Sequence, residues 1–402
     1  MNEQVKLSIP DHVSEHLVYD FDFYDDPRYQ PDIHDGIAQV IAEAPPVFFT
    51  PRNGGHWVLA GHAALFDAVR NPAVFSSSKM ALPPLLNEPH QVPIYSDPPE
   101  HAPYRAPLNK AFSPRAMMAL QDDVRALANS LIDKVIDRGE CDFAEAVAEP
   151  LPVSIFLKLM GLPLDKLNEY RKWVRIILGS TDVPLKEATF GAVIGSMSTT
   201  IQERMSERRE DLISTLLDTE IDGRSITFEE MQGYCLLLFI AGLDTVMNGM
   251  CFGVRHLARD AALQVELRAH PERITDAMEE MLRRYTFTIP GRVIKTDHEA
   301  YGAHFKAGDR VLLLLPAGDL DPKEFIEPMR FDLNREHKVH MAFNAGPHRC
   351  VGSHLARIEM RILYEEWLKR VPPFRLDPDR PPTFHGGHVL GCDSLHLLWE
   401  PK

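Results

Sequence analysis

A single cysteine, Cys350, stands between a glycine-rich segment, FNAGPHR, and an expected helix that begins near SHLAR. A thiol just before a helix is favoured as a thiolate by the helix dipole and by free backbone N–H groups. His348 and Arg349 add positive potential beside it. Most lone cysteines of this kind are inert buried thiols, so a reactive and an inert interpretation of Cys350 both stand at this point.

An acid and an alcohol, Asp244 and Thr245, occur inside a long apolar segment with the sequence AGLDT. A threonine within a helix commonly donates to the carbonyl four residues earlier, and a buried aspartate needs a partner. Burying both groups in mid-helix is costly unless something uses them. The pair is therefore a candidate catalytic site.

The spacing F-x-x-G-x-H-x-C-x-G, filled by Phe343, Gly346, His348, Cys350 and Gly352, resembles the haem-binding signature of the cytochrome P-450 family. The resemblance implies haem b as the cofactor and Cys350 as the proximal thiolate ligand of its iron. A thiolate there pushes electron density toward iron and favours O–O cleavage. We interpret the two glycines as clearance for the porphyrin.

The same resemblance extends to other segments. Glu280 and Arg283 match the family's E-x-x-R motif, which implies a buried structural ion pair completed by residues 321–335. Taken alone, a Glu and an Arg three residues apart are usually a solvated surface pair. Asp244 and Thr245 match the family's catalytic pair, in which Thr245 hydrogen-bonds dioxygen and Asp244 helps to relay protons. A local distortion of the helix near residues 241–242 is expected to form a groove for oxygen.

Haem carries two propionates, which need positively charged or hydrogen-bonding partners. The resemblance implies a set of propionate partners and of residues against the ring: His101, Arg105, Arg292 and His348, with Phe343, Gly352 and Ala241.

Within the family the sequence most resembles soluble bacterial camphor hydroxylases, with two departures. Pro89 stands where those enzymes carry a tyrosine that hydrogen-bonds the substrate ketone, and proline has no donor. Pro290 stands where they carry an aspartate. These departures argue against camphor itself as the substrate, and a camphor-type monoterpene hydroxylase is the alternative.

The resemblance places a mostly apolar set of residues around the substrate: Met80, Leu82, Leu237, Ile240, Ala241, Phe287, Thr288, His388 and Val389. Each also has an ordinary core interpretation. A pocket with few hydrogen-bonding groups suits a small terpenoid or norisoprenoid ketone such as an ionone.

The elements that must position these residues are mostly helical. Residues 47–61 read as a hairpin with an Asn-Gly-Gly turn, and residues 75–100 as a long irregular loop. Thr227 and Glu230 have the spacing of a capping box, and the helix after them is predicted to run for ~30 residues across the core. Residues 291–316 alternate strand-like runs with glycine turns. We expect the mainly α cytochrome P-450 fold with a smaller β portion, as one triangular domain over residues 1–402.

Composition excludes other classes. The formal net charge is −15, so a nucleic-acid partner is not expected. The five cysteines are scattered without a CxxC pair, which argues against zinc and disulfide frameworks and favours a reducing cytoplasm. The polar N-terminus has no apolar core of signal-peptide or anchor length, so we expect a soluble monomer without membrane attachment.

No flavin or iron–sulfur motif occurs in the sequence, so electrons must come from outside. The resemblance implies an acidic iron–sulfur ferredoxin with an NADH-dependent reductase, docking near Arg105 and Arg349.

The expected activity is a bacterial haem-thiolate monooxygenase. One rival is a peroxygenase, although such relatives tend to lose the acid–alcohol pair. Another is a haem-based gas-binding or sensor protein without turnover.

Overall fold

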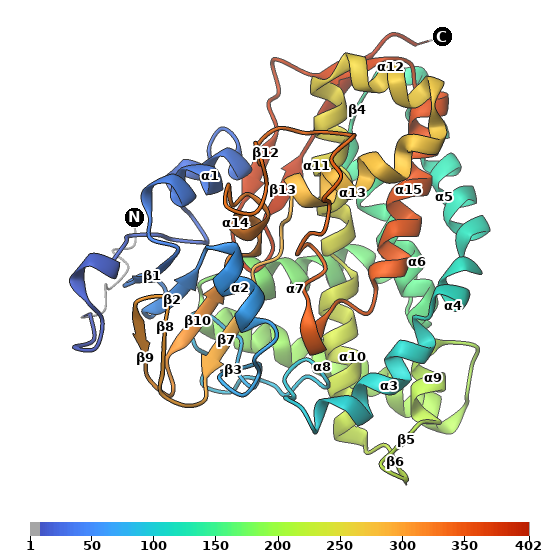
Figure 1. The fold of residues 1–402 in the computed structure, drawn as a ribbon. Helices are drawn as coiled ribbons and strands as arrows, with labels where there is room; N and C mark the ends of the chain where they lie inside the picture. The colour runs from blue at the N-terminus through green and yellow to red at the C-terminus, as the bar shows by residue number, and fades with distance from the viewer. Residues whose placement is uncertain (1–8, 402) are drawn as a thin grey trace.

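A computed structural model describes residues 9–401, and it shows a helical body with a small β region packed to one side (Figure 1). About 50% of the residues are helical and 12% lie in strands, so the predicted mainly α class is confirmed. Two apolar clusters fill the interior. The larger one lies mainly among the helices, and the smaller one includes side chains of the five-stranded sheet such as Trp57, which is completely buried.

The α-helices are α1 (Ile33–Glu43), α2 (His62–Ala68), α3 (His101–Ala111), α4 (Pro114–Met118), α5 (Gln121–Asp133), α6 (Pro150–Met160), α7 (Leu167–Gly179), α8 (Val183–Ser206), α9 (Leu212–Leu217), α10 (Phe228–Gly242), α11 (Thr245–Arg259), α12 (Ala261–Ala269), α13 (Ile274–Arg284), α14 (Leu315–Asp319) and α15 (Ser353–Arg370).

The strands are β1 (Val47–Thr50), β2 (His56–Leu59), β3 (Phe75–Ser76), β4 (Glu140–Asp142), β5 (Glu220–Ile221), β6 (Arg224–Ser225), β7 (Gly291–Ile294), β8 (His298–Ala300), β9 (Ala303–Phe305), β10 (Arg310–Leu313), β11 (Phe374–Leu376), β12 (Thr383–His385), β13 (Gly391–Ser394) and β14 (His396–Trp399). The largest sheet has the order β1-β2-β10-β7-β3, and β10 joins β2 in parallel while its other pairs are antiparallel.

Local signals in the sequence correspond to these elements. β1 and β2 form the predicted hairpin, and its turn residues Asn53, Gly54 and Gly55 all have positive φ. Residues 77–100 contain no helix or strand, as predicted for the irregular loop. The capping box is present, because the Thr227 hydroxyl accepts from the backbone of Glu230 and the Glu230 carboxylate accepts in return.

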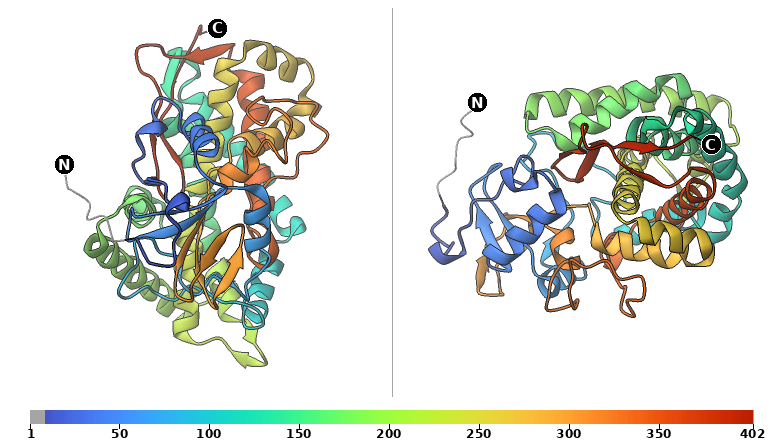
Figure 2. Two further views of the ribbon diagram at one scale, coloured as in Figure 1. Left: turned by 60° about the vertical axis from the view of Figure 1, so that its left-hand side comes forward. Right: turned by 90° about the horizontal axis from the view of Figure 1, so that it is seen from above.

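The predicted long central helix is present as two consecutive helices, α10 and α11. α10 and α11 together span Phe228–Arg259, and Leu243 and Asp244 break the helical run between them. The break follows directly after the residues where a distortion was expected. The span is long and apolar enough to cross a membrane, but 72% of its most apolar window is buried inside the protein. Figure 2 shows it as the central element, with α7 and α8 on one side and α15 on the other. It is a core helix of the fold.

Candidate active site

The segment before α15 presents Cys350 to an internal cavity. A short helical turn, Gly346–His348, precedes the cysteine, and Gly352 caps α15. The Cys350 backbone N–H donates to the Phe343 carbonyl over 2.8 Å, which closes the segment into a tight loop. The thiol lies deep within the protein, yet it is accessible because it faces the cavity.

Burial dominates the electrostatics of the thiol. It raises the pKa of Cys350, and the Gly352 N–H and the guanidinium groups of Arg105, Arg357 and Arg349 oppose that rise without cancelling it. A thiol surrounded in this way becomes a thiolate when a metal cation binds it, because the cation supplies the missing positive charge.

The two signature glycines differ in what surrounds them. A Cβ on Gly352 would meet only the Cys350 Sγ, at 3.9 Å, so this position leaves space beside the thiol. Gly346 has φ +66°, and a Cβ there would lie 2.2 Å from the Val69 carbonyl oxygen. Its role is therefore close packing of the loop against the end of α2, and the prediction of porphyrin clearance at Gly346 was wrong.

Four basic residues lie together near Cys350, and none of them forms an ion pair with a carboxylate among residues 9–401. The rings of His101 and His348 are 4.6 Å apart, and the Nε2 atom of each is buried without a partner. Burial and the charges of Arg292 and Arg105 lower the pKa of His348. Arg292 is 2% exposed, burial lowers its pKa to about 10, and no carboxylate pairs with it within residues 9–401. Two propionates would supply both acceptors and charge, so the residues present fit a haem.

Several of the residues predicted to hold the cofactor border the cavity, namely Phe343, Gly352, Ala241, Arg105 and His348, whereas His101 and Arg292 are not on its wall. Arg105 also donates through Nε to Asn109 over 2.8 Å and through Nη2 to the Arg349 carbonyl. Its side chain is therefore turned inward, toward Cys350.

Asp244 and Thr245 lie at the break between α10 and α11. The Thr245 hydroxyl donates to the Ala241 carbonyl over 3.0 Å, which is the ordinary bond for a threonine in a helix, and Thr245 also lines the cavity. Gly242 allows the chain at the break to pack closely against α6, because a Cβ at this position would lie 2.5 Å from the Phe156 ring.

The Asp244 carboxyl is buried, at 4% exposure. Burial raises its pKa, while the charges of His385, Arg171 and Arg175 and a hydrogen bond from Asn248 oppose that rise. The group can therefore hold a proton closer to neutral pH than an exposed aspartate, which suits a proton donor.

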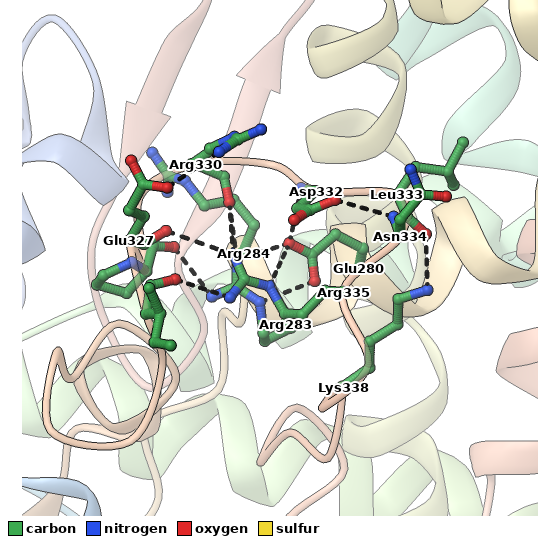
Figure 3. A network of polar contacts seen from close by, with 12 residues as sticks. Glu280, Arg283, Arg284, Glu327, Arg330, Asp332, Leu333, Asn334, Arg335 and Lys338 are labelled. Atoms are coloured by element: carbon green, nitrogen blue, oxygen red, sulfur yellow. Dashed lines mark hydrogen bonds and ion pairs between the residues drawn. The ribbon is translucent and has the colours of Figure 1, made fainter.

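The Glu280–Arg283 pair is fully buried, with both side chains at 0% exposure and 2.8 Å between Nη2 and Oε1 (Figure 3). Arg335 and the Asp332 backbone N–H each donate to the same Glu280 oxygen over 3.0 Å. Arg283 also donates to the Asp319 and Pro328 carbonyls. The segment 321–335 thus surrounds the pair, as the sequence motif indicated.

The cavity has a volume of about 370 Å³ and is bordered mainly by apolar side chains. The predicted substrate residues on its wall are Met80, Leu237, Ile240, Ala241, Phe287, Thr288, His388 and Val389. Leu82 is the exception, because its side chain is buried in the main core and only its carbonyl accepts a bond, from Tyr24.

Sequence reasoning missed polar residues on the cavity wall, namely Gln91, Tyr95, Lys186 and Glu359. Pro89 does not line the cavity, so the irregular loop offers Tyr95 in place of the absent tyrosine, with its hydroxyl held by Glu88. Pro290 does line it. A signal for Lys186 was present in the sequence, because it falls four residues before Phe190 on the apolar face of a helix.

Comparison with known proteins agrees with this geometry. The cytochrome P450 family model matches residues 154–391. Probable cytochrome P450 127A1 of Sinorhizobium fredii is 35% identical over 401 residues, covering 97% of each chain. A steroid C26-monooxygenase of Mycolicibacterium smegmatis is 30% identical and covers 85% of this chain and 87% of its own. The crystal structure of CYP101J2 has a TM-score of 0.89 at 32% identity, covering 98% of this chain and all of the other. Since these matches include the segments that hold Cys350, Asp244 and Thr245, the chain belongs to the cytochrome P450 family.

Proposed function

We propose that the protein is a soluble, cytoplasmic monooxygenase that hydroxylates a small hydrophobic terpenoid or norisoprenoid of ionone-like size, using O2 and electrons from a ferredoxin. Membership of the family makes it an oxidoreductase of the P450 monooxygenase type with haem b as cofactor. The observation that carries the substrate proposal is a single cavity that joins Cys350, Thr245 and a mainly apolar wall.

When bound, the haem supplies the activation of O2, from which one oxygen atom enters a C–H bond of the substrate. Cys350 would bind the iron through Sγ, and His101, His348, Arg105 and Arg292 would hold the propionates. The apolar wall excludes water and brings a hydrocarbon close to the site of chemistry.

Proton delivery is the role we assign to the break between α10 and α11. Thr245 keeps a hydroxyl proton at the surface of the cavity, where it now donates to the Ala241 carbonyl. Asp244 lies behind it with a raised pKa and is held by Asn248. A carboxyl whose pKa is raised keeps its proton to higher pH than an exposed aspartate does, and it can resupply the hydroxyl each time the hydroxyl gives up its own proton.

The substrate class follows from the wall and from the relatives. The family member from Mycolicibacterium smegmatis is named as a steroid monooxygenase, which supports a hydrophobic substrate. A camphor-type monoterpene remains the alternative, although Tyr95, the tyrosine of the irregular loop on the cavity wall, has its hydroxyl held by Glu88 and offers no free donor to a ketone.

The electron donor we propose is an acidic iron–sulfur ferredoxin with an NADH-dependent reductase. Arg349 is exposed beside Cys350 and could attract such a partner, whereas Arg105 is turned toward the cavity. Reversing the charge at Arg349 should slow reduction at low salt and leave it unchanged at high salt. An unchanged rate at low salt would contradict this docking surface.

The function is tested by spectroscopy and turnover of the haem-loaded protein. The reduced protein with CO should show the red-shifted Soret band of thiolate ligation, and Cys350→Ser should lose it. Titration with β-ionone should shift the haem spin state more strongly than camphor does. NADH-coupled turnover with a reductase and ferredoxin should give hydroxylated product. A normal CO band without any turnover would favour the gas-binding alternative.

A further inference from the structure

Lys186 lies where a lysine is not expected. It is on the buried face of α8, in register with Thr189, Phe190 and Val193, and only 1% of it is exposed. Lysine is almost never fully buried unless its charge is paired, because an ammonium group loses its hydration on burial. Burial lowers the pKa of Lys186 to about 8, which leaves it mostly protonated at neutral pH.

A second buried cation on the same face of α8, Arg204, does have a carboxylate partner. Arg204 is also 1% exposed, and it forms an ion pair with Asp211 and donates to the Gly161 carbonyl over 2.9 Å. Lys186 has no such carboxylate within the described part of the chain, and its hydrogen bond goes to the Tyr24 hydroxyl over 3.2 Å. One buried cation of α8 therefore has a carboxylate in contact, whereas the other has only the hydroxyl and the ring of Tyr24, whose centroid lies 5.6 Å from the Lys186 Nζ.

The acid whose charge acts on Lys186 is already engaged elsewhere. Glu88 raises the pKa of Lys186 from a distance. Its Oε1 accepts from the backbone N–H groups of Met80 and Ala81, and its Oε2 faces Arg310 at 3.8 Å. The carboxylate thus holds the irregular loop in place and is not a counter-ion in contact with Lys186.

Lys186 borders the same cavity as Cys350, on its far side. α8, which carries Lys186, and α15, which follows Cys350, lie on opposite sides of α10 and α11 (Figure 2). Arg105 and Glu359, the other Arg, Lys, Asp or Glu residues on the wall, belong to α3 and α15. His388 is close to Lys186 but adds no charge at neutral pH, because burial lowers its pKa to about 4. The α8 side of the cavity therefore carries one positive charge that has no carboxylate in contact with it among the described residues.

Tyr24 fixes the direction of the ammonium group. Its hydroxyl donates to the Leu82 carbonyl and accepts from Lys186, so its one proton is already committed. An ammonium group has three donors, and the bond to Tyr24 uses one of them. Two remain for a ligand in the cavity, which is the number that the oxygens of one carboxylate accept.

We propose that Lys186, oriented by Tyr24, binds a carboxylate of the substrate, so that the substrate class is a hydrophobic carboxylic acid of terpenoid size. The acid end lies at α8 and the hydrocarbon end extends toward Cys350. This assignment rests on the proposed function, since it takes the cavity as the substrate pocket. A neutral ketone could accept the same hydrogen bonds, but it would leave the buried charge uncompensated.

The test compares acids with their own methyl esters in the haem-loaded enzyme. The probes are β-cyclogeranic acid, geranic acid and decanoic acid, each beside its ester, with binding followed by the haem spin shift. At least one acid should bind about tenfold more tightly than its ester, the value of one charge-assisted bond. Lys186→Met should abolish that preference while keeping ester affinity, and Lys186→Arg should retain it. Lys172→Met, at an exposed lysine of α7, is the matched control and should change nothing.

Esters that bind as tightly as their acids in all three pairs would overturn the proposal, and so would an acid preference that survives in Lys186→Met. If that variant fails to fold, Tyr24→Phe, which removes the orienting hydroxyl, should weaken acid binding and spare the ester. The CO spectrum separates this proposal from the function on which it rests. If the CO spectrum has a normal thiolate band and β-ionone shifts the spin state, but acids bind no better than their esters, only the carboxylate site is rejected. If the thiolate band is absent, the proposed function and the carboxylate site are both rejected.

Discussion

Asn248 and Asp244 lie one helical turn apart, and the amide nitrogen of Asn248 donates to the Asp244 Oδ2 over 2.9 Å. The Asn248 Oδ1 accepts the backbone N–H of Cys392 over 3.0 Å, which ties the break between α10 and α11 to β13. Asn248 is completely buried. One side chain therefore both orients the candidate proton donor and links it to the C-terminal hairpin.

Asn248→Ala should lower stability and uncouple turnover. The change leaves a buried carboxylate and a buried N–H short of a partner, which costs about 1–3 kcal/mol. It also removes the hydrogen bond that orients the Asp244 carboxyl, so proton delivery should be impaired and the product formed per NADH consumed should fall. Urea unfolding and product yield measure the two effects. Asn129→Ala, which removes a similar amide-to-carbonyl bond on half-buried α5, should leave product yield unchanged.

The buried pair Glu280–Arg283 can be compared with an exposed pair of the same spacing. Glu327 and Arg330 are also three residues apart, 2.9 Å from each other, and more than 60% exposed. Arg283→Ala should cost about 3–5 kcal/mol, because it strands a buried charge. Arg330→Ala should cost less than about 1 kcal/mol. Equal shifts in the denaturation midpoint would contradict the structural role of the Glu280 network.

Glu359 should make stability depend on pH. Burial raises its pKa to about 8, and its Oε1 has no partner. A carboxyl whose pKa is higher in the folded state than in the unfolded state stabilises the fold through its bound proton. This contribution to stability is complete below the pKa of the unfolded state and is lost as pH rises toward 8. Glu359→Gln should therefore raise the melting temperature at pH 8, and the gain should disappear near pH 4.5. The exposed Glu145→Gln should show no such trend. A pH-independent difference would refute the argument.

Gly242 should resist substitution even by alanine. Its Cβ would enter the Phe156 ring at 2.5 Å, so Gly242→Ala should destabilise the protein by about 1–3 kcal/mol. Phe156→Leu in the same chain should recover part of that loss, which a double-mutant cycle measures. Gly191→Ala on α8 has open space around it and should stabilise by about 0.5–1 kcal/mol. If Gly242→Ala and Gly191→Ala changed the free energy of unfolding by similar amounts, close packing of Gly242 against α6 would not be the reason that this position needs glycine.

Much of the candidate site was predictable because its signals are local. The spacing from Phe343 to Gly352 specifies a tight loop before a helix, and the capping box at Thr227 specifies where the central helix begins. Asp244 and Thr245 stood out because polar groups are costly in an apolar run. The buried state of Glu280 was predictable only through the family resemblance, since the same spacing at Glu327 gives an exposed pair.

The sequence by itself determined the cysteine loop, the central helix with its polar interruption, and the mainly helical class, because each depends on neighbours within a few residues. Tertiary structure alone decided which side chains meet in the cavity. Gly346 packs on Val69, Leu82 turns into the core, and Lys186 enters the cavity without a carboxylate partner among the described residues. Those outcomes depend on how α2, α8 and the irregular loop pack together, and burial changes the cost of a charge only once that packing exists.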